Sequence, residues 1–283
     1  MKISTLLLSS SVPLLALGIA GSASAYQFEI GADYSQGDVE DVDFDTVGVT
    51  GTYYFGDVPT GNGPLAEAAF LGRASGFSLG YSASDIDDVD INIDTLEGSL
   101  RLVSMDTGWL ATLGFARVEL DDSVNTAHVD QLSIGFGRYF GENNTITLHY
   151  SDLETKVDGF SGSADGNSVS LQFKGVAVGR TTYVLEAGIT YSEIEDEDAT
   201  GFSVGWTVYP SMNIGAGVSY AQDMISTSVF EGIAASADID SKVLVFNGSW
   251  FVTESIEIGL RYADIEVGDV DAVEIGLTGR IRF

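Results

Sequence analysis

Carboxylates are the most numerous charged groups in this chain, and they are unevenly spread. The sequence of 283 residues contains 42 Asp and Glu against 12 Lys and Arg, a formal charge of −30 at pH 7. Seven acidic stretches hold 28 of these carboxylates and a single base, Lys156: 38–45, 85–90, 121–122, 152–165, 193–198, 223–240 and 264–271. Such dense negative charge attracts cations and repels anions within a Debye length of ~8 Å at physiological salt. It also disfavours nucleic acid as a partner.

Other charged or titratable residues stand singly among small and polar residues, and these are the candidates for lining a pore. They are Glu97, Arg101, Arg117, Glu119, His149, Lys174, Glu186, Glu257, Arg261, Glu274 and Arg280. In a water-filled lumen, facing acids and bases set a transverse field that tunes ion selectivity. Individually, most of them also fit solvated wall residues, or paired struts that fill a closed lumen.

The elements that must position these groups are β-strands, because apolar residues alternate with small or polar ones along most of the chain. No run of 18 apolar residues follows residue 26, so no transmembrane helix is expected. Six alternating segments end in a tyrosine with an acid two to four positions behind it: Tyr34/Asp38, Tyr81/Asp85, Tyr150/Asp152, Tyr191/Glu193, Tyr220/Asp223 and Tyr262/Asp264. Tyrosine favours the headgroup level of a bilayer, and a carboxylate just beyond it has reached water. The pattern predicts a transmembrane β-barrel whose strands face lipid on one side and a wet lumen on the other.

We predict an all-β, antiparallel, up-and-down barrel of fourteen strands. The expected strands are 26–35, 43–55, 74–84, 91–103, 108–120, 125–140, 144–157, 167–178, 181–194, 200–209, 212–224, 237–252, 255–267 and 271–283. Sixteen strands is the alternative, if 65–73 pairs as a strand of its own. In the fourth strand the apolar residues change parity between Ile93 and Leu96, which indicates a bulge.

Two kinds of connection alternate between the predicted strands. Short, nearly neutral turns contrast with the acidic stretches, and bacterial barrels have short periplasmic turns and longer extracellular loops. We therefore place the acids outside, as a cation-preferring mouth formed by Asp38, Asp85, Asp88, Glu193, Glu195, Asp196, Glu197 and Asp198. The six tyrosines then mark the outer membrane edge. A second aromatic set should mark the inner edge: Tyr53, Tyr54, Phe55, Tyr139, Phe140, Tyr209, Trp250, Phe251 and Phe283.

Two segments need separate interpretation. Residues 1–25 combine Lys2, an apolar run from Leu6 to Ala20 and an Ala-Ser-Ala cleavage site, which predicts a signal peptide followed by one barrel domain, 26–283. An uncleaved anchor is the less favoured alternative.

Residues 56–73 are too long for a tight turn and contain two prolines. A short helix on the periplasmic side or inside the lumen, or an extension of the third strand, would fit them; we favour an ordered periplasmic connection.

Two near-motifs resemble Gram-negative outer-membrane porins. The end Gly279-Arg280-Ile281-Arg282-Phe283 is similar to the C-terminal signal that outer-membrane assembly machinery reads, with Phe283 as its last residue. Residues 61–71, after Tyr53-Tyr54-Phe55-Gly56, resemble a stretch in general bacterial porins of marine gammaproteobacteria. Size and strand number are similar to those of the monomeric outer membrane protein G type. Unlike trimeric general porins, the chain has no long third outer loop. The sequence does not decide between a monomer and a trimer.

The sequence therefore predicts a pore in the outer membrane of a Gram-negative bacterium. Ions and small hydrophilic solutes would diffuse through it, with cations preferred and without any cofactor or metal. Its expected partners are outer-membrane lipid, lipopolysaccharide and the assembly machinery. One alternative is a structural or adhesive barrel without an open channel. A remote one is a lipid hydrolase, because His149 and Ser151 share a strand face as in outer-membrane phospholipase; parity, however, places this pair inside rather than toward lipid. No catalytic residue is assigned.

Overall fold

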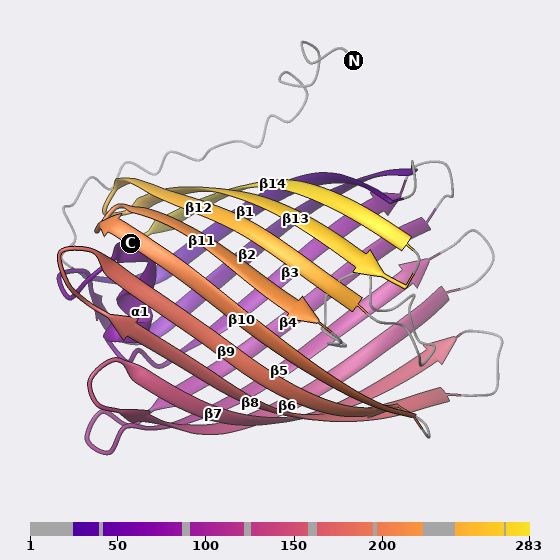
Figure 1. Ribbon diagram of the computed structural model, residues 1–283, viewed down its shortest axis with the longest axis horizontal. Coiled ribbons are helices and arrows are strands. Elements are labelled where there is room, and N and C mark those ends of the chain that lie inside the picture. The colour runs from indigo at the N-terminus through magenta and orange to yellow at the C-terminus, as the bar shows by residue number, and fades with distance from the viewer. Residues whose placement is uncertain are drawn as a thin grey trace, which may run out of the picture.

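A computed structural model describes residues 25–39, 42–86, 91–121, 126–157, 163–194, 197–222, 241–268 and 270–283. Fourteen antiparallel strands form one closed barrel (Figure 1), which confirms the predicted fold class. The strands are β1 (Ala25–Val39), β2 (Val42–Pro59), β3 (Gly76–Ile86), β4 (Ile91–Val103), β5 (Trp109–Asp121), β6 (Thr126–Phe140), β7 (Asn144–Val157), β8 (Ser163–Ala177), β9 (Thr182–Ile194), β10 (Glu197–Ser211), β11 (Ile214–Gln222), β12 (Ser241–Thr253), β13 (Ile256–Val267) and β14 (Val270–Arg282). A 3₁₀ turn, η1 (Leu65–Glu67), and a short helix, α1 (Ala68–Leu71), follow β2.

Each strand pairs with its neighbour in sequence, and β1 pairs with β14 to close the barrel, from Glu29 opposite Arg282 to Val39 opposite Ala272. Closure leaves no unpaired sheet edge, as a membrane-spanning sheet requires. The short turns, α1 and the C-terminus all lie at one end of the barrel (Figure 1). Because bacterial barrels have their short turns on the periplasmic side, this is the periplasmic end. None of the described helices is long and apolar enough to cross a membrane.

The outward face of the barrel is apolar around its middle. Successive outward positions of β13 are Ile256, Ile258, Leu260 and Tyr262, and all four side chains are exposed. The six tyrosines share the outward parity of such residues. Two of them donate hydrogen bonds to a carboxylate on the next strand, Tyr34 to Asp45 at 2.8 Å and Tyr81 to Asp94 at 2.6 Å. These contacts are what a tyrosine at a membrane edge would make, since its ring needs an apolar setting and its hydroxyl a polar partner.

Beyond the tyrosines, the strands continue and their polarity reverses. On β13 the apolar residues after Tyr262 are Ala263 and Ile265, which have inward parity and are buried. On β4 Ile93 faces inward whereas Leu96 faces outward, and the pairing of β4 with both neighbours shows no shift of register. The predicted bulge in this strand is therefore wrong: the parity change reflects a switch of environment, not an extra residue.

Candidate functional site: the barrel lumen

The segment between β2 and β3 folds into the lumen instead of forming the favoured periplasmic connection. Leu65, Ala68 and Phe70 are buried, and the last two pack against inward residues from opposite sides of the barrel. Ala68 contacts the cluster of Tyr26 and Val58 on β1 and β2, whereas Phe70 belongs to a cluster from five other strands, namely Leu110, Tyr139, Val176, Val184 and Tyr209. We call residues 60–75 the inward turn. Because both walls hold it, it crosses the bore at the periplasmic end.

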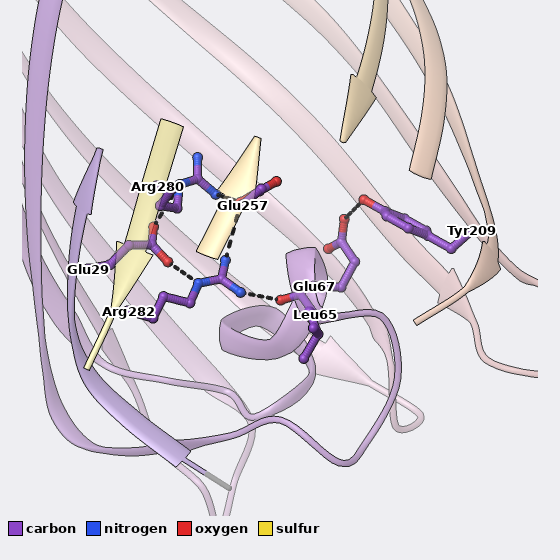
Figure 2. Close-up of polar contacts among 7 residues, drawn as sticks. All are labelled: Glu29, Leu65, Glu67, Tyr209, Glu257, Arg280 and Arg282. Atoms are coloured by element: carbon purple, nitrogen blue, oxygen red, sulfur yellow. Dashed lines mark hydrogen bonds and ion pairs between the residues drawn. The ribbon is translucent and has the colours of Figure 1, made fainter. Parts of the chain in front are cut away.

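A hydrogen bond from Arg282, whose charge is paired on the neighbouring strands, attaches the inward turn to β14 (Figure 2). Arg282 is only 3% exposed; its Nε lies 2.6 Å from Glu29 Oε2, and its Nη1 donates to the Leu65 carbonyl at 2.8 Å. Arg280 lies 3.3 Å from Glu29 Oε1 and 3.0 Å from Glu257 Oε2. Two guanidinium groups thus face two carboxylates across β1, β13 and β14. The charges cancel, and buried charge is tolerated only when it is paired in this way.

A second set of contacts holds the other side of the turn. Lys174 Nζ lies 2.9 Å from both Glu67 Oε2 and Glu186 Oε1, and Tyr209 donates to Glu67 Oε1 at 3.2 Å. Figure 2 shows Glu67 pointing from the turn toward Tyr209. On the next side, Tyr139 donates to the Phe70 carbonyl at 2.9 Å and accepts from Arg101. Side chains from β6, β8 and β10 therefore complete the attachment that β14 begins.

These contacts correct part of the predicted inner aromatic girdle. Tyr53, Phe55, Phe140, Trp250 and Phe283 are exposed on the outward face, as a girdle requires. Tyr139, Tyr209 and Phe251 are buried on the inward face, and Tyr54 packs against the inward turn. Consecutive aromatics in the sequence thus serve two environments, because neighbouring residues of a strand point to opposite faces.

Above the inward turn, the middle of the lumen is hollow and polar. A cavity of about 450 Å³ is lined by Arg101, Thr112, Thr147, His149, Lys174, Glu186 and Ser203 with neighbouring side chains. Arg261 and Glu274 form an ion pair at 3.3 Å. In the described part of the chain no cation pairs with Glu97 or Asp33, both of which have inward parity. The lumen therefore offers unpaired carboxylates beside hydroxyl groups.

Nine of the eleven predicted lining residues have inward parity in the structure: Glu97, Arg101, His149, Lys174, Glu186, Glu257, Arg261, Glu274 and Arg280. The placement of Arg117 and Glu119 is wrong. Both share the parity of the exposed Trp109 and Phe115, and Arg117, 55% exposed, pairs with Asp130 on the outward face of β6. The apolar residues between them, such as Val118, are the inward ones.

The predicted acidic mouth is arranged differently from expectation. Asp38, Asp85 and Glu193 lie on β1, β3 and β9, with the outward parity of the tyrosines before them. They surround the outside of the strand ends and do not face the lumen. Asp88, Glu195 and Asp196 lie outside the described residues, and Glu197 and Asp198 begin β10.

Several residues that organise the lumen are not among the predicted lining set. Arg282 has the parity of Arg280, and Glu29 lies opposite it in the barrel closure, so parity and strand order together could have found both. Glu67 could not be found in this way, because it lies on the inward turn and no strand pattern governs its direction.

His149 and Ser151 both have the lumen-facing parity expected of them, opposite Ser170 and Ser168 of β8. A lipid substrate would approach from the other face of the sheet. Among the residues that the structure describes, no group of three or more His, Asp and Glu side chains could hold a metal ion.

Comparisons with known proteins agree with this architecture. Residues 1–99 match the family model described as "Putative general bacterial porin". No curated protein is significantly similar in sequence. Several solved structures share the fold, and three of them serve as examples. The outer membrane protein Omp33 of Acinetobacter baumannii is 22% identical, with a TM-score of 0.65 over 92% of this chain and 99% of that one. The CymD monoaromatic hydrocarbon channel is 9% identical, with a TM-score of 0.55 over 91% and 89%. A Pseudomonas aeruginosa homologue of FadL is 10% identical, with a TM-score of 0.53 over 92% and 90%.

At these identities the structural likeness establishes the fold alone, whereas the family match adds a porin signature to the first third of the chain. Together they confirm the predicted location in the outer membrane of a Gram-negative bacterium. The chain is thus an outer-membrane β-barrel that resembles the general bacterial porins.

Proposed function

We propose that the protein is a porin through which ions and small hydrophilic solutes diffuse passively, with cations preferred. The observation that carries this proposal is the cavity in the lumen, which charged and hydroxyl side chains line together with Phe70 and Leu110 of the cluster around the inward turn. A lumen that served only as a scaffold would gain most from apolar packing, because unpaired polar groups in a closed interior are costly.

Cation preference follows from the balance of inward charges. Glu97 and Asp33 have no ionic partner in the described part of the chain, whereas Arg101 is the inward base of mid-lumen without an ion pair there. Its guanidinium also donates to Tyr139 and so lies toward the wall. The outward acids of the strand ends add a weaker negative potential, since the barrel wall separates them from the ion path.

The path for solutes is narrowest where the inward turn crosses the lumen. The turn is fixed to β6, β8, β10 and β14, so conductance should be small for a barrel of fourteen strands. The same feature favours a second candidate, a structural barrel that passes nothing. The two functions differ in one measurable property, which is the current through the folded protein.

Planar-bilayer recording on refolded residues 26–283 in a KCl gradient tests the proposal. Discrete current steps with a reversal potential on the cation-selective side are the expected result. An electrically silent protein whose barrel is shown to be folded by its heat-modifiable migration would contradict the porin and support the structural barrel.

A further inference from the structure

The strand ends at the extracellular side carry apolar residues on their inward face, and this lining has no role in passing hydrophilic solutes. We call it the apolar collar. Its members are Val39, Phe44, Ile86, Ile93, Val118, Leu120, Val129, Leu153, Val243, Val245, Ile265 and Val267. They come from nine strands, namely β12, β13 and β1 to β7; β14 lies between β13 and β1 but contributes none of them. In a porin built only for hydrophilic solutes, these lumen positions would be expected to be polar.

Two parts of the collar differ in their accessibility. On β12 to β14, Ile265 is buried and packs with Ala263 and Ala272 against neighbouring valines. On β5 to β7, Val118, Leu120, Val129 and Leu153 point inward and are only partly buried, as are the valines around Ile265. Register brings Val118 directly opposite Val129, so their side chains form a cross-strand pair. None of the residues of this second part belongs to a buried cluster of the described residues, so part of its apolar surface remains accessible on the inward face.

A carboxylate lies directly below the second part of the collar. Glu97 pairs in register with Ala116 and Val118 with Thr95, which makes Glu97 and Val118 diagonal neighbours on the inward face. Diagonal neighbours on a sheet are ~7–8 Å apart. Glu97 is exposed to the lumen and has no ionic partner among the described residues. The site thus combines an apolar wall with one negative charge at its inner edge.

The outside of the same strand ends carries further acids, which add a weaker preference for cations to the one that Glu97 sets. Outward positions carry Asp94 on β4 and Glu119 on β5, whereas Glu154 and Asp130 are neutralised by ion pairs with Lys156 and Arg117. Charges of one sign around an opening raise the local concentration of the opposite sign. An anion with the same apolar body would be repelled mainly by Glu97, and more weakly by the outward acids.

We propose that the extracellular part of the lumen is a binding vestibule for small amphiphilic organic cations. The apolar part of the solute contacts Val118, Leu120, Val129 and Leu153, and its cationic group points toward Glu97. This inference deepens the proposed porin function and rests on it, because the vestibule would select the solutes that enter the pore. Each methylene moved from water onto the collar should tighten binding about fourfold.

Methyl NMR on isotope-labelled residues 26–283, refolded in detergent, tests the vestibule without any need for current. The probe is butyltrimethylammonium. Three controls separate its features: tetramethylammonium lacks the tail, 1-butanol lacks the charge and butanesulfonate reverses it. Methyl shifts at Val118, Val129 and Leu153 should saturate with the probe at least about tenfold below the concentrations that the controls need, since burial of two methylenes alone gives about 15-fold.

Substitutions locate the site. Val118→Thr keeps the shape but replaces a methyl with a hydroxyl, and should weaken probe binding about fourfold, whereas Thr155→Val enlarges the collar and should tighten it. Glu97→Gln should weaken binding of the probe and leave 1-butanol unaffected. Glu119→Gln, at the same level but on the outward face, is the matched control and should change binding little.

The possible results separate the two proposals. Conductance in KCl without probe-dependent shifts at the collar methyls would overturn the vestibule and leave the porin intact. Equal affinity for butyltrimethylammonium and butanesulfonate would also overturn it, because the charge argument would then be wrong. Saturable binding in a protein that conducts no current would support the vestibule as a site while contradicting the porin.

Discussion

At the periplasmic end of the lumen, charges face inward and hold a piece of chain across the bore; at the extracellular end, apolar side chains face inward and charges face outward. Arg282 illustrates the first arrangement, in which a nearly buried guanidinium is neutralised by Glu29 and fixes the inward turn. Ile93 illustrates the second, at 1% exposure on the lumen side. Residues alternate between the two faces along the whole strand, but the outward ones are apolar in the membrane and charged beyond it. The reason is that the surroundings of the barrel change from lipid to water along one strand.

The largest difference between the ends should appear when a buried charge is removed. Arg282→Ala removes one of the positive charges that neutralise the Glu29 carboxylate, and it leaves the Leu65 carbonyl without its hydrogen-bond donor. We therefore expect the free energy of unfolding to fall by about 3–5 kcal/mol. Urea titration of the refolded protein measures it. Lys156→Ala, which breaks an exposed pair with Glu154, is the control and should cost less than about 1 kcal/mol. Similar costs for both variants would contradict the buried network.

Apolar packing of the inward turn should be the next most sensitive feature. Phe70→Ala removes the side chain that packs with Tyr139 and Tyr209, at a cost of about 3 kcal/mol to docking of the turn. The chain has no cysteine, so a single Ala66→Cys reports the docked state by its rate of thiol labelling. Labelling should accelerate about 100-fold with Phe70→Ala, and much less with Phe70→Leu. An unchanged rate would mean that the ionic contacts alone hold the turn.

Charge selectivity should respond to inward acids more than to outward ones. Replacing Glu97 by Gln removes an unpaired lumen carboxylate, and we expect the potassium-to-chloride permeability ratio to fall by up to about fivefold, the equivalent of about 1 kcal/mol for one solvated charge. The reversal potential in a KCl gradient measures it. Glu193→Gln, on the outward face of β9, should have a smaller effect. If the outward substitution had the larger effect, the acidic exterior rather than the lumen would set selectivity.

The smallest effect should come from the outward pair beyond the tyrosines. Arg117→Gln separates Arg117 from Asp130 on the outside of the barrel, so single-channel conductance should stay the same. A clear change in conductance would restore Arg117 to the pore lining.

Most of the barrel follows from sequence, because alternation and turn length are local signals. β4, β7 and β13 begin and end within one residue of their predicted bounds. The parity rule fails at Arg117, where nearby apolar residues suggest the lipid side although they face the lumen. Continuing the phase from Trp109 and Phe115 gives the correct face, since no register shift intervenes. Apolar residues at alternate positions therefore identify the lipid-facing side of a strand only as far as the membrane edge.

The contacts of the inward turn could not be predicted from the sequence, for a different reason. Glu67 and Lys174 are 107 positions apart, and their ion pair depends on the path of a segment without strand periodicity. Pairs such as Tyr53 and Tyr54 show a similar limit. Both read as membrane-edge aromatics, yet only one can face lipid, and the other packs against the turn because adjacent residues alternate faces.

The most direct test of the account replaces the inward turn. Tyr54 pairs with Gly76, so an Asn-Gly hairpin in place of residues 55–75, which are the end of β2 and the inward turn, would join β2 to β3 without the segment that crosses the bore. Single-channel conductance of this variant and of the unmodified protein should be compared in the same KCl solution. We predict a small cation-selective conductance for the unmodified protein and one several times larger for the variant. Equal conductance, or silence from a folded barrel in both, would contradict a lumen that is a pore narrowed by residues 60–75.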